Sequence, residues 1–586
     1  MSGLDPVTLE VIANALHSTA CDMGVTIWRT AYSTVVRDSR DCSAALFDAE
    51  GRLIAQADMI PALLGSMHLA LKECLDNHYP IERIDAGDVL LTNHPYLGGT
   101  HTPDIMVFTP IHWEGKIVAF AGSIAHHIDL GSIQAGGIGV MSDMFQEGLL
   151  MPPVKLYQQG VLNETLIKIL GANSRWPHLV DGDLRAQVTA NRLGVRRVDE
   201  LLRRYGHAVL QAAWERQMDY SEARIRAELA KLPDGDYPIV GYLDSDGLDL
   251  DRPIKVAVTV RLRQGKVIYD FTGSAPQCRG NVNCVTSSVA ATCYYVTRCI
   301  SDPDVPENEG CYRPVEMILP EGSIVNPTPP AATSGKHPMA QRIADLLIQA
   351  FAEIAPERSA AASCGSTSNY TVVYDGGQIQ YEMMGGGFGA RATKDGINGI
   401  QVNMSKCVGL QIEEAEAAYP VRIERFELLR DSGGAGRWRG GLGLHRMLVV
   451  DRPAVLSISS DTELTPPPGV HGGEAGLPGR KILNPGRADE RRLNAKAANV
   501  RLERGDSVSF VTPGSGGFGA PAERDPNLVL QDVQDGKVSL DAARKVYLVA
   551  IDDAARAVDG PATRRLRDEA RGIGSARHKA EALDGA

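Results

Sequence analysis

Two apolar segments separated by only three residues constrain the fold of this chain more than any other feature. Residues 104–112 and 116–125 are rich in valine, isoleucine and phenylalanine, and Trp113, Glu114 and Gly115 lie between them. Apolar segments of this kind on both sides of so short a connection are typical of two antiparallel strands joined by a tight turn. The sequence therefore predicts a β-hairpin.

The register of this hairpin brings two histidines and an aspartate to its open end. With the tip at the end of the connection, the numbers of facing residues add up to about 229, so His126 lies opposite Pro103 and Asp104. His101 precedes Asp104 by three residues, in a glycine-rich loop. Two imidazoles and a carboxylate are a donor set that suits Zn, Mn or Fe, so we predict a metal site. The alternative is that these histidines only satisfy polar groups at a strand end; His127, of opposite strand parity, should point away.

Composition and charge restrict the class of protein. The chain has 586 residues, 44% of them hydrophobic and 23% charged, which indicates a folded protein of several domains. A net charge of −12 argues against a nucleic-acid partner. We expect no membrane span and no secretory signal, because there is no long apolar segment and no charged segment followed by an apolar one at the start.

Cysteine usage indicates the compartment. None of the ten cysteines forms a Cys-x-x-Cys pair. Without an export signal, reduced and mostly buried thiols are expected, and hence a cytoplasmic protein.

The fold class predicted for the chain is α+β, a multidomain protein with mixed antiparallel sheets, helical segments and a β-rich, glycine-rich C-terminal half. A helix should begin at Asp5-Pro6, because aspartate caps helices and proline is favoured in the first turn. A second hairpin is predicted over 41–57, and Asp41 opens its first strand. The predicted regions are an N-terminal metal-site domain (1–234, with long helices over 180–231), a β-rich middle domain of short strands (235–335), a glycine-rich α/β domain (336–525, with a helix near 338–354) and a helical C-terminal tail (526–586).

Three glycine clusters could be mistaken for phosphate-binding loops. They cover residues 385–389, 433–443 and 512–519, but none has the Gly-x4-Gly-Lys-Ser/Thr pattern and none lies convincingly between a strand and a helix. Turns and close approach of backbones explain them better. We therefore predict no nucleotide site in this chain.

A series of motifs extends in order along roughly residues 4–545. They include DPVTLEVIANAL, NHPYLGGTHTPD, FQEGLLMPPVKL, YDFTGSAPQCRGNVN, GGGFGAR, DSGGAGRWRGGLG and TPGSGGFG. The chain thereby resembles the B-type subunit of the hydantoinase/oxoprolinase family, whose relatives include N-methylhydantoinase, 5-oxoprolinase, caprolactamase and the acetone and acetophenone carboxylases.

The resemblance implies an ATP-dependent enzyme of at least two kinds of subunit that acts on a small carbonyl compound. A hydantoinase A-type partner with an actin-like ATPase fold would bind ATP and phosphorylate the substrate or bicarbonate. The present chain would carry a divalent metal, Zn or Mn, within a hetero-oligomer of (αβ)2 or larger.

The resemblance also implies site residues. The metal ligands of the family look like Asp41, His101, Asp104 and His126 here, which adds one carboxylate from a neighbouring strand to the hairpin set. His127 and Asp129 are candidates for catalytic roles, either orienting the ligands or transferring protons, and the competing interpretation is a purely structural role.

Two departures from the family pattern weaken an assignment as 5-oxoprolinase. Residues 400–407 read IQVNMSKC where many amide-hydrolysing relatives have a segment rich in His and Thr-Asn-Thr, and His68 replaces a usual proline. Three functions stay open: hydrolysis of a cyclic amide (hydantoin or lactam), carboxylation of a ketone, and a non-catalytic scaffold for the ATPase subunit. Retention of the proposed ligands argues against the scaffold.

Overall fold

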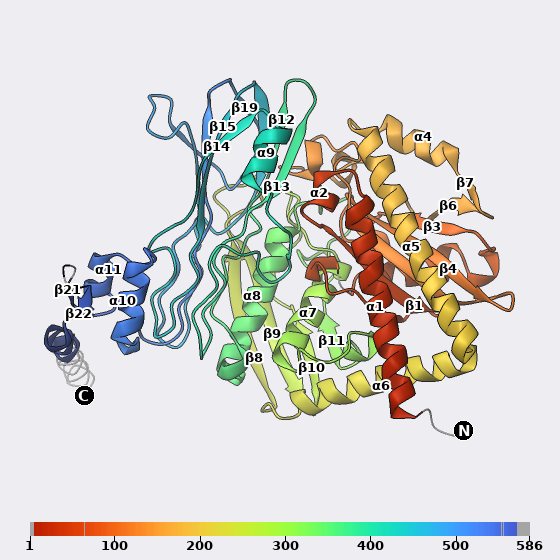
Figure 1. Ribbon diagram of the computed structural model, residues 1–586, viewed down its shortest axis with the longest axis horizontal. Coiled ribbons are helices and arrows are strands. Elements are labelled where there is room, and N and C mark those ends of the chain that lie inside the picture. Colours follow the sequence, from red (N-terminus) through yellow and green to blue (C-terminus); the bar gives the residue numbers. More distant parts are fainter. Residues whose placement is uncertain (1–4, 64, 553, 555, 571–586) are drawn as a thin grey trace.

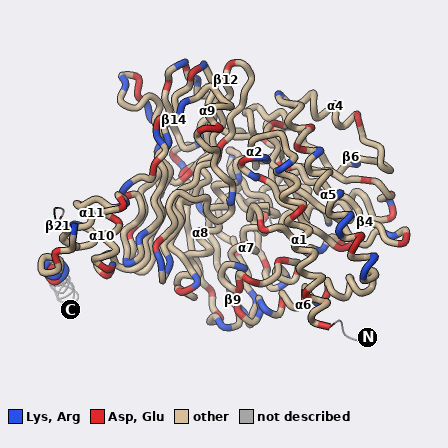
Figure 2. The backbone as a smooth tube through the Cα atoms, in the orientation of Figure 1, with Lys and Arg blue, Asp and Glu red and all other residues tan. Residues whose placement is uncertain are grey.

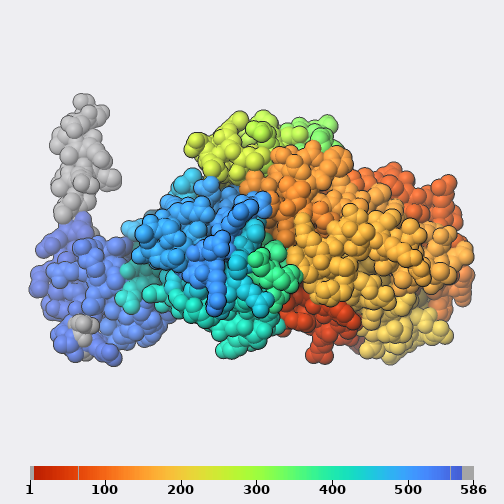
Figure 3. All heavy atoms as spheres, turned by 90° about the horizontal axis from the view of Figure 1, so that it is seen from above, coloured from red at the N-terminus to blue at the C-terminus, as the bar shows by residue number. Residues whose placement is uncertain are grey.

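The computed structural model describes residues 5–63, 65–552, 554 and 556–570. The molecule is elongated, with the N-terminal part at one end and the C-terminal sheets and helices toward the other (Figures 1 and 3). The helices and antiparallel sheets confirm the α+β class. Among the described residues, no helix combines the length and apolar character needed to cross a membrane. Acidic and basic residues are interspersed along the chain (Figure 2).

An antiparallel sheet of seven strands forms the N-terminal part, in the order β2-β1-β5-β4-β3-β6-β7. Its strands are β1 (Cys42–Asp48), β2 (Leu53–Gln56), β3 (Val89–Thr92), β4 (Asp104–Trp113), β5 (Lys116–His126), β6 (Val154–Gln158) and β7 (Val161–Leu162). Both predicted hairpins are confirmed, as β1–β2 and β4–β5.

Helices lie on both faces of this sheet. They are α1 (Pro6–Thr30), α2 (Thr34–Arg37), α3 (Met67–Glu73), α4 (Glu164–Ala172), α5 (Pro177–Tyr205) and α6 (His207–Leu229), and α1 and α5 cross the sheet in Figure 1. Asp5 caps α1 as predicted, accepting the backbone N–H groups of Val7 and Thr8. Alternate residues of β4 enter different cores, because successive side chains of a strand point to opposite faces: Val107 packs with α5, and Phe108 with the middle of the chain.

The middle of the chain adds a four-stranded sheet and two helices. The strands are β8 (Gly235–Leu243), β9 (Ile254–Arg263), β10 (Lys266–Asp270) and β11 (Val315–Ile318), and the helices are α7 (Thr286–Ile300) and α8 (His337–Ile354). Helix α8 agrees with the predicted helix. Helix α7 was not predicted, since its threonines, valines and tyrosines favour strands, and burial of one face against α8 and the sheet overrides that preference.

Two C-terminal sheets enclose a separate core. One contains β12 (Asn369–Tyr374), β13 (Ile379–Met383), β16 (Ala454–Ser459) and β19 (Lys496–Leu502). The other contains β14 (Val421–Leu428), β15 (Leu444–Val450), β17 (Arg480–Leu483), β18 (Arg491–Leu493) and β20 (Ser507–Val511). Tyr370 and Phe510 stack between them with ring centroids 4.6 Å apart. Beyond α9 (Ile412–Ala418), the tail contains α10 (Pro526–Gln534), α11 (Leu540–Lys545), β21 (Ile551–Asp552), β22 (Ala557–Val558) and a helical stretch at 560–570. Residues 571–586 of the predicted helical tail lie outside the described residues.

The glycine clusters form a bundle of extended segments packed backbone against backbone. A Cβ added to Gly387 would lie 2.1 Å from the carbonyl oxygen of Gly441, and one added to Gly516 would lie 2.0 Å from that of Pro468. The segments also exchange backbone hydrogen bonds, as from Gly441 N–H to the Phe388 carbonyl. The predicted close approach of backbones is confirmed, and neither glycine is required there for a positive φ. We call these segments (385–389, 433–443, 469–476 and 512–519) the glycine bundle.

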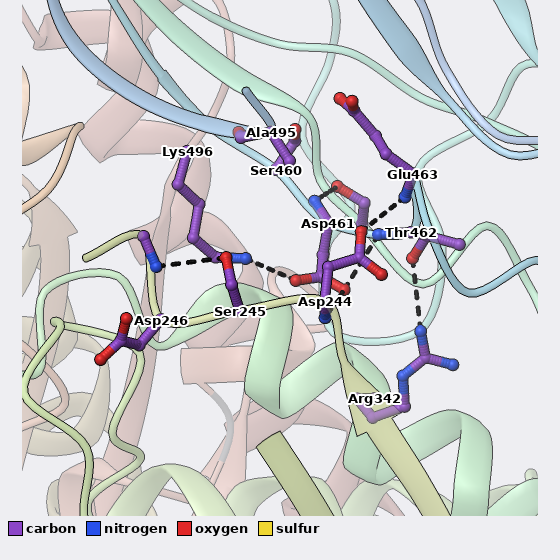
Figure 4. A network of polar contacts seen from close by, with 12 residues as sticks. Asp244, Ser245, Asp246, Arg342, Ser460, Asp461, Thr462, Glu463, Ala495 and Lys496 are labelled. Atoms are coloured by element: carbon purple, nitrogen blue, oxygen red, sulfur yellow. Dashed lines mark hydrogen bonds and ion pairs between the residues drawn. The ribbon is translucent and has the colours of Figure 1, made fainter. Parts of the chain in front are cut away.

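A buried polar network joins the middle sheet to the C-terminal sheets (Figure 4). Asp244, which follows β8, accepts the backbone N–H groups of Glu463, Leu464 and Thr465. Lys496 lies 2.5 Å from Asp461, which in turn accepts the backbone N–H of Asp244. Because α8 packs against β8, the network also fixes the helix whose first turn lies at the predicted metal site.

Candidate metal centre

The β4–β5 hairpin has the predicted tip and places Asp104 opposite His126. Trp113 pairs with Lys116, so Glu114 and Gly115 form the turn, and both have positive φ values, as the two-residue turns of hairpins require. The pairing shifts by one position between Ile111 and His112, so the facing residue numbers add up to 230 rather than 229 over most of the hairpin.

Three side chains meet at the open end of this hairpin. His101, Asp104 and His126 offer ligand atoms that all lie within 4.8 Å of one another. His101 Nε2 lies 3.1 Å from Asp104 Oδ2, and His126 Nδ1 lies 3.3 Å from Asp104 Oδ1 and 3.3 Å from His101 Nε2. Each residue is only about 1% exposed. The structure thus brings together the three residues that the hairpin register predicted.

Hydrogen bonds around this cluster fix the orientation of His101. Its Nδ1 lies 3.0 Å from the carbonyl oxygen of Ser334, which leaves Nε2 directed at Asp104. Such a bond from the second ring nitrogen is common in metal-binding histidines, because it fixes the tautomer and the ring. Ser334 is held in turn by Glu147, whose carboxylate accepts the backbone N–H groups of Thr333 and Ser334 at 2.6 Å.

The electrostatics of the cluster favour a neutral His101 beside an ionised Asp104. Burial lowers the pKa of His101 to about 4, so this ring is neutral near pH 7. Burial alone would raise the pKa of Asp104, but His101 and His126 together hold it well below its usual range. Burial likewise opposes the charged form of His126, yet the hydrogen bond to Asp104 raises its pKa. Metals bind neutral imidazole and ionised carboxylate, so His101 and Asp104 are in the form that a divalent ion requires, and a bound ion would replace the proton on His126.

Asp41 lies beside the cluster but outside the group of three. Its carbonyl oxygen accepts the backbone N–H of His126 at 3.0 Å, which places the residue immediately before β1 at the end of β5. Burial raises the pKa of its carboxyl to about 6, and the charges of His126, Asp104 and Lys336 also act on it. Asp41 therefore interacts with the charges of the site. Its carboxylate is not among the three groups whose ligand atoms lie close together.

Three further side chains surround the cluster that the sequence did not single out. Lys336 Nζ lies 3.7 Å from Asp104 Oδ2 although the side chain is only 2% exposed. The ring centroid of His337 lies 4.9 Å from that of His101, and the centroid of Tyr381 lies 5.3 Å from that of His126. Lys336 and His337 come from the start of α8 and Tyr381 from β13. A lysine followed by His-Pro at a helix start was the only available signal.

The two predicted catalytic residues make their contacts away from the three ligand atoms. His127 Nε2 lies 3.0 Å from Gln187 Oε1 on α5, in accord with its opposite strand parity, and burial lowers its pKa. Asp129 accepts the guanidinium of Arg175 at 2.7 Å and the backbone N–H of Arg175 at 2.7 Å. These bonds fix the segment that follows β5.

The two departures from the family pattern occupy different places. His68 is buried against Tyr312, with ring centroids 5.7 Å apart. The segment 400–407 packs on α8, where Gln341 donates to the carbonyl oxygen of Val402. Burial, and then the charge of Asp41, raise the pKa of the Cys407 thiol in this segment.

Comparison with known proteins matches this architecture to a family. The family model described as hydantoinase B/oxoprolinase matches residues 5–521. An uncharacterised protein of Methanocaldococcus jannaschii is 37% identical over 96% of this chain and 100% of its own length. A putative D-/L-hydantoinase subunit of a Pseudomonas species is 32% identical over 96% of this chain and 98% of its own.

Two solved structures share the fold. The ATP-dependent caprolactamase of Pseudomonas jessenii superimposes with a TM-score of 0.89 at 30% identity, covering 97% of this chain and 100% of the other. The nucleotide-free acetone carboxylase superimposes with a TM-score of 0.88 at 20% identity, covering 98% and 84%. At this lower identity the likeness concerns the fold alone.

Proposed function

We propose a function from the family to which this chain belongs, the hydantoinase B/oxoprolinase family. The chain is the metal-binding catalytic subunit of an ATP-dependent enzyme that hydrolyses a cyclic amide, either a hydantoin or a lactam. The observation that carries the proposal is the buried cluster of His101, Asp104 and His126. The names of two relatives, a putative hydantoinase and a caprolactamase, support the substrate class.

The proposed ligands are His101, Asp104 and His126, with Asp41 as a fourth from the adjacent strand. When bound, a divalent ion, Zn or Mn, supplies a Lewis acid that polarises a carbonyl oxygen or makes water more acidic. Two imidazole nitrogens and one or two carboxylates leave coordination positions for substrate, as a catalytic site requires.

The residues around the cluster would position the substrate and its protons. Lys336 Nζ, close to Asp104, can donate a hydrogen bond to a carbonyl or phosphoryl oxygen of the activated substrate. The ring of Tyr381 against His126 and that of His337 against His101 limit the space beside the ligands and exclude bulk water. His127 and Asp129 are proposed to orient this set through Gln187 and Arg175.

ATP is proposed to bind a hydantoinase A-type partner, in a cytoplasmic hetero-oligomer of (αβ)2 or larger. The Pseudomonas relative is named as one subunit of a hydantoinase, which supports the existence of a partner in that system. The reaction on the present chain would then begin with an amide whose oxygen has been phosphorylated.

The experiment is an assay of the chain co-expressed with an A-type partner. Substrate-dependent ATP hydrolysis is measured against hydantoins, lactams and ketones, with and without bicarbonate, and the products are identified by mass spectrometry. The expected product is the ring-opened acid, in which the former amide carbonyl is a carboxylate and the ring nitrogen is released from it. A carboxylated ketone would replace the proposal with the carboxylase function, and turnover unaffected by loss of His126 would reduce the chain to a scaffold.

A further inference from the structure

A cavity of about 350 Å³ lies at the edge of the two C-terminal sheets. It is lined by β13 on one sheet, by β14 and β15 on the other, and by the segment 399–411. None of the three clustered metal-site residues lines it. It is therefore a separate site.

A buried arginine with free donors lies in this cavity. Arg446 is 1% exposed, and its Nη1 donates to Glu382. Its Nε and Nη2 have no hydrogen-bond partner among the described residues, although both atoms are buried. Buried donors without a partner cost free energy, so two of them on one guanidinium point to a bound partner that the chain itself does not supply.

The free atoms form the edge of a guanidinium that receives carboxylates. Arg37 uses the same two atoms in this protein, where Nε and Nη2 donate to the two oxygens of Asp38 at 2.9 and 2.8 Å. This paired geometry matches the planar fork of arginine to both oxygens of a carboxylate. In the part of the chain that the structure describes, no acceptor is bonded to this edge of Arg446.

The other charged residue of the cavity is already satisfied. Besides Arg446, Glu382 accepts the hydroxyl of Tyr370 at 2.7 Å and the amide of Gln380 at 3.3 Å. Glu382 and Arg446 are the only charged residues among the described residues of the lining. The hydrogen bonds left for a ligand are therefore those that Nε and Nη2 of Arg446 can donate.

The remaining walls are largely apolar. Met383, Met384, Leu410 and Leu444 line the cavity, and the guanidinium carbon of Arg446 lies 5.2 Å from the ring centroid of Phe426. A ligand should therefore combine one anionic group with a short hydrocarbon part.

We propose that this cavity binds a small organic carboxylate, with its two oxygens on Nε and Nη2 of Arg446 and its hydrocarbon part against Phe426 and Leu444. The site does not depend on the metal centre. If the proposed hydrolysis also holds, the ring-opened product belongs to this chemical class, since opening an amide creates a carboxylate.

The test is a calorimetric titration of the full chain with butanoate and with butanamide, its neutral isostere. Butanoate should bind at one site per chain and at least about tenfold more tightly than butanamide, because only a carboxylate forms both charge-assisted bonds. Arg446→Lys keeps the positive charge but lacks the fork, and it should weaken butanoate binding by at least about tenfold. Arg422→Lys, on the exposed part of β14, is the matched control and should leave binding unchanged.

Two further variants protect the test against misfolding and against binding at the metal. Ile400→Trp enlarges a side chain of the lining that takes no part in the Arg446–Glu382 ion pair, and it should abolish binding by reducing the volume of the cavity. His126→Ala should bind butanoate as the wild type does. The proposal is overturned if butanoate does not bind, if butanamide binds equally well, or if binding disappears in His126→Ala and persists in Arg446→Lys.

Discussion

Asp104 and His126 face each other across β4 and β5, with a carboxylate oxygen of one 3.3 Å from a ring nitrogen of the other. The pair is a consequence of strand register, because a two-residue turn fixes which residues oppose each other at the far end of a hairpin. A slip of one residue would turn His126 to the opposite face of the sheet, where His127 now lies. Ten pairs of facing residues, with one shift of register, thus separate the short turn from the metal site.

His126→Ala should lose metal. Removal of one of three clustered donors leaves too few ligands to hold the ion. Elemental analysis of the purified protein should therefore show substoichiometric Zn or Mn. Activity of the complex should fall by at least about 100-fold, more than loss of an outer hydrogen bond costs. His112→Ala, on the same hairpin near the turn, should retain full metal content. If folded His126→Ala contained as much metal as the wild type, the metal site would not lie at the end of the β4–β5 hairpin.

Asp41→Asn should weaken metal binding by about 10- to 100-fold and lose most activity while the chain folds normally, because the amide keeps the shape but not the charge. A chelator competition titration measures the affinity. Asp38→Asn, a nearby carboxylate paired with Arg37, is the control. Wild-type affinity and turnover in Asp41→Asn would limit the site to the three clustered residues.

Glu147 should make the free energy of unfolding depend on pH. Burial raises its pKa from 4.5 to about 7 in the folded chain, so between these values the folded state holds a proton that the unfolded state releases. Stability contributed by this group therefore decreases as pH rises from about 4.5 to about 7. Thermal melts across this range should show a smaller decrease for Glu147→Gln than for the wild type. Glu424→Gln, at an exposed position, is the control. If Glu147→Gln had the same pH profile of stability as the wild type, the raised pKa of Glu147 would be contradicted.

Gly387→Ala should destabilise the chain by more than about 3 kcal/mol, because the new methyl group meets backbone that cannot move aside. Its Cβ would lie 2.1 Å from the carbonyl oxygen of Gly441, whereas a Cβ on Gly409 meets nothing within 4 Å. The melting temperatures of the two alanine variants should differ accordingly. Equal melting temperatures would contradict the packing of the glycine bundle.

The isolated chain should not bind ATP at micromolar concentration. The glycine clusters that might hold phosphate are filled by neighbouring backbone, as at Gly516 against Pro468. Calorimetric titration of the chain alone, compared with the complex, measures this. Micromolar affinity of the isolated chain would show that a glycine segment binds nucleotide after all.

The sequence could predict what depends on neighbours in the chain. The β4–β5 pairing, and with it Asp104 beside His126, follows from a short turn and apolar strands. Lys336 and His337 were missed because only tertiary packing brings the start of α8 to Asp104 and His101. Asp41 could be proposed only through the resemblance to a family. Helix α7 was missed because local preference for strand was outweighed by burial, which no single segment reveals.

The packing of the glycine bundle limits how the molecule can adjust to a substitution there. Elsewhere an added methyl group can be absorbed by rotation of a neighbouring side chain, but at Gly387, Gly440 and Gly516 the nearest atoms belong to peptide groups, which have no rotamer to change. The separation between its segments is set by peptide geometry and backbone hydrogen bonds alone. A side chain added at one of these positions must therefore move a whole segment of the bundle rather than a single neighbour.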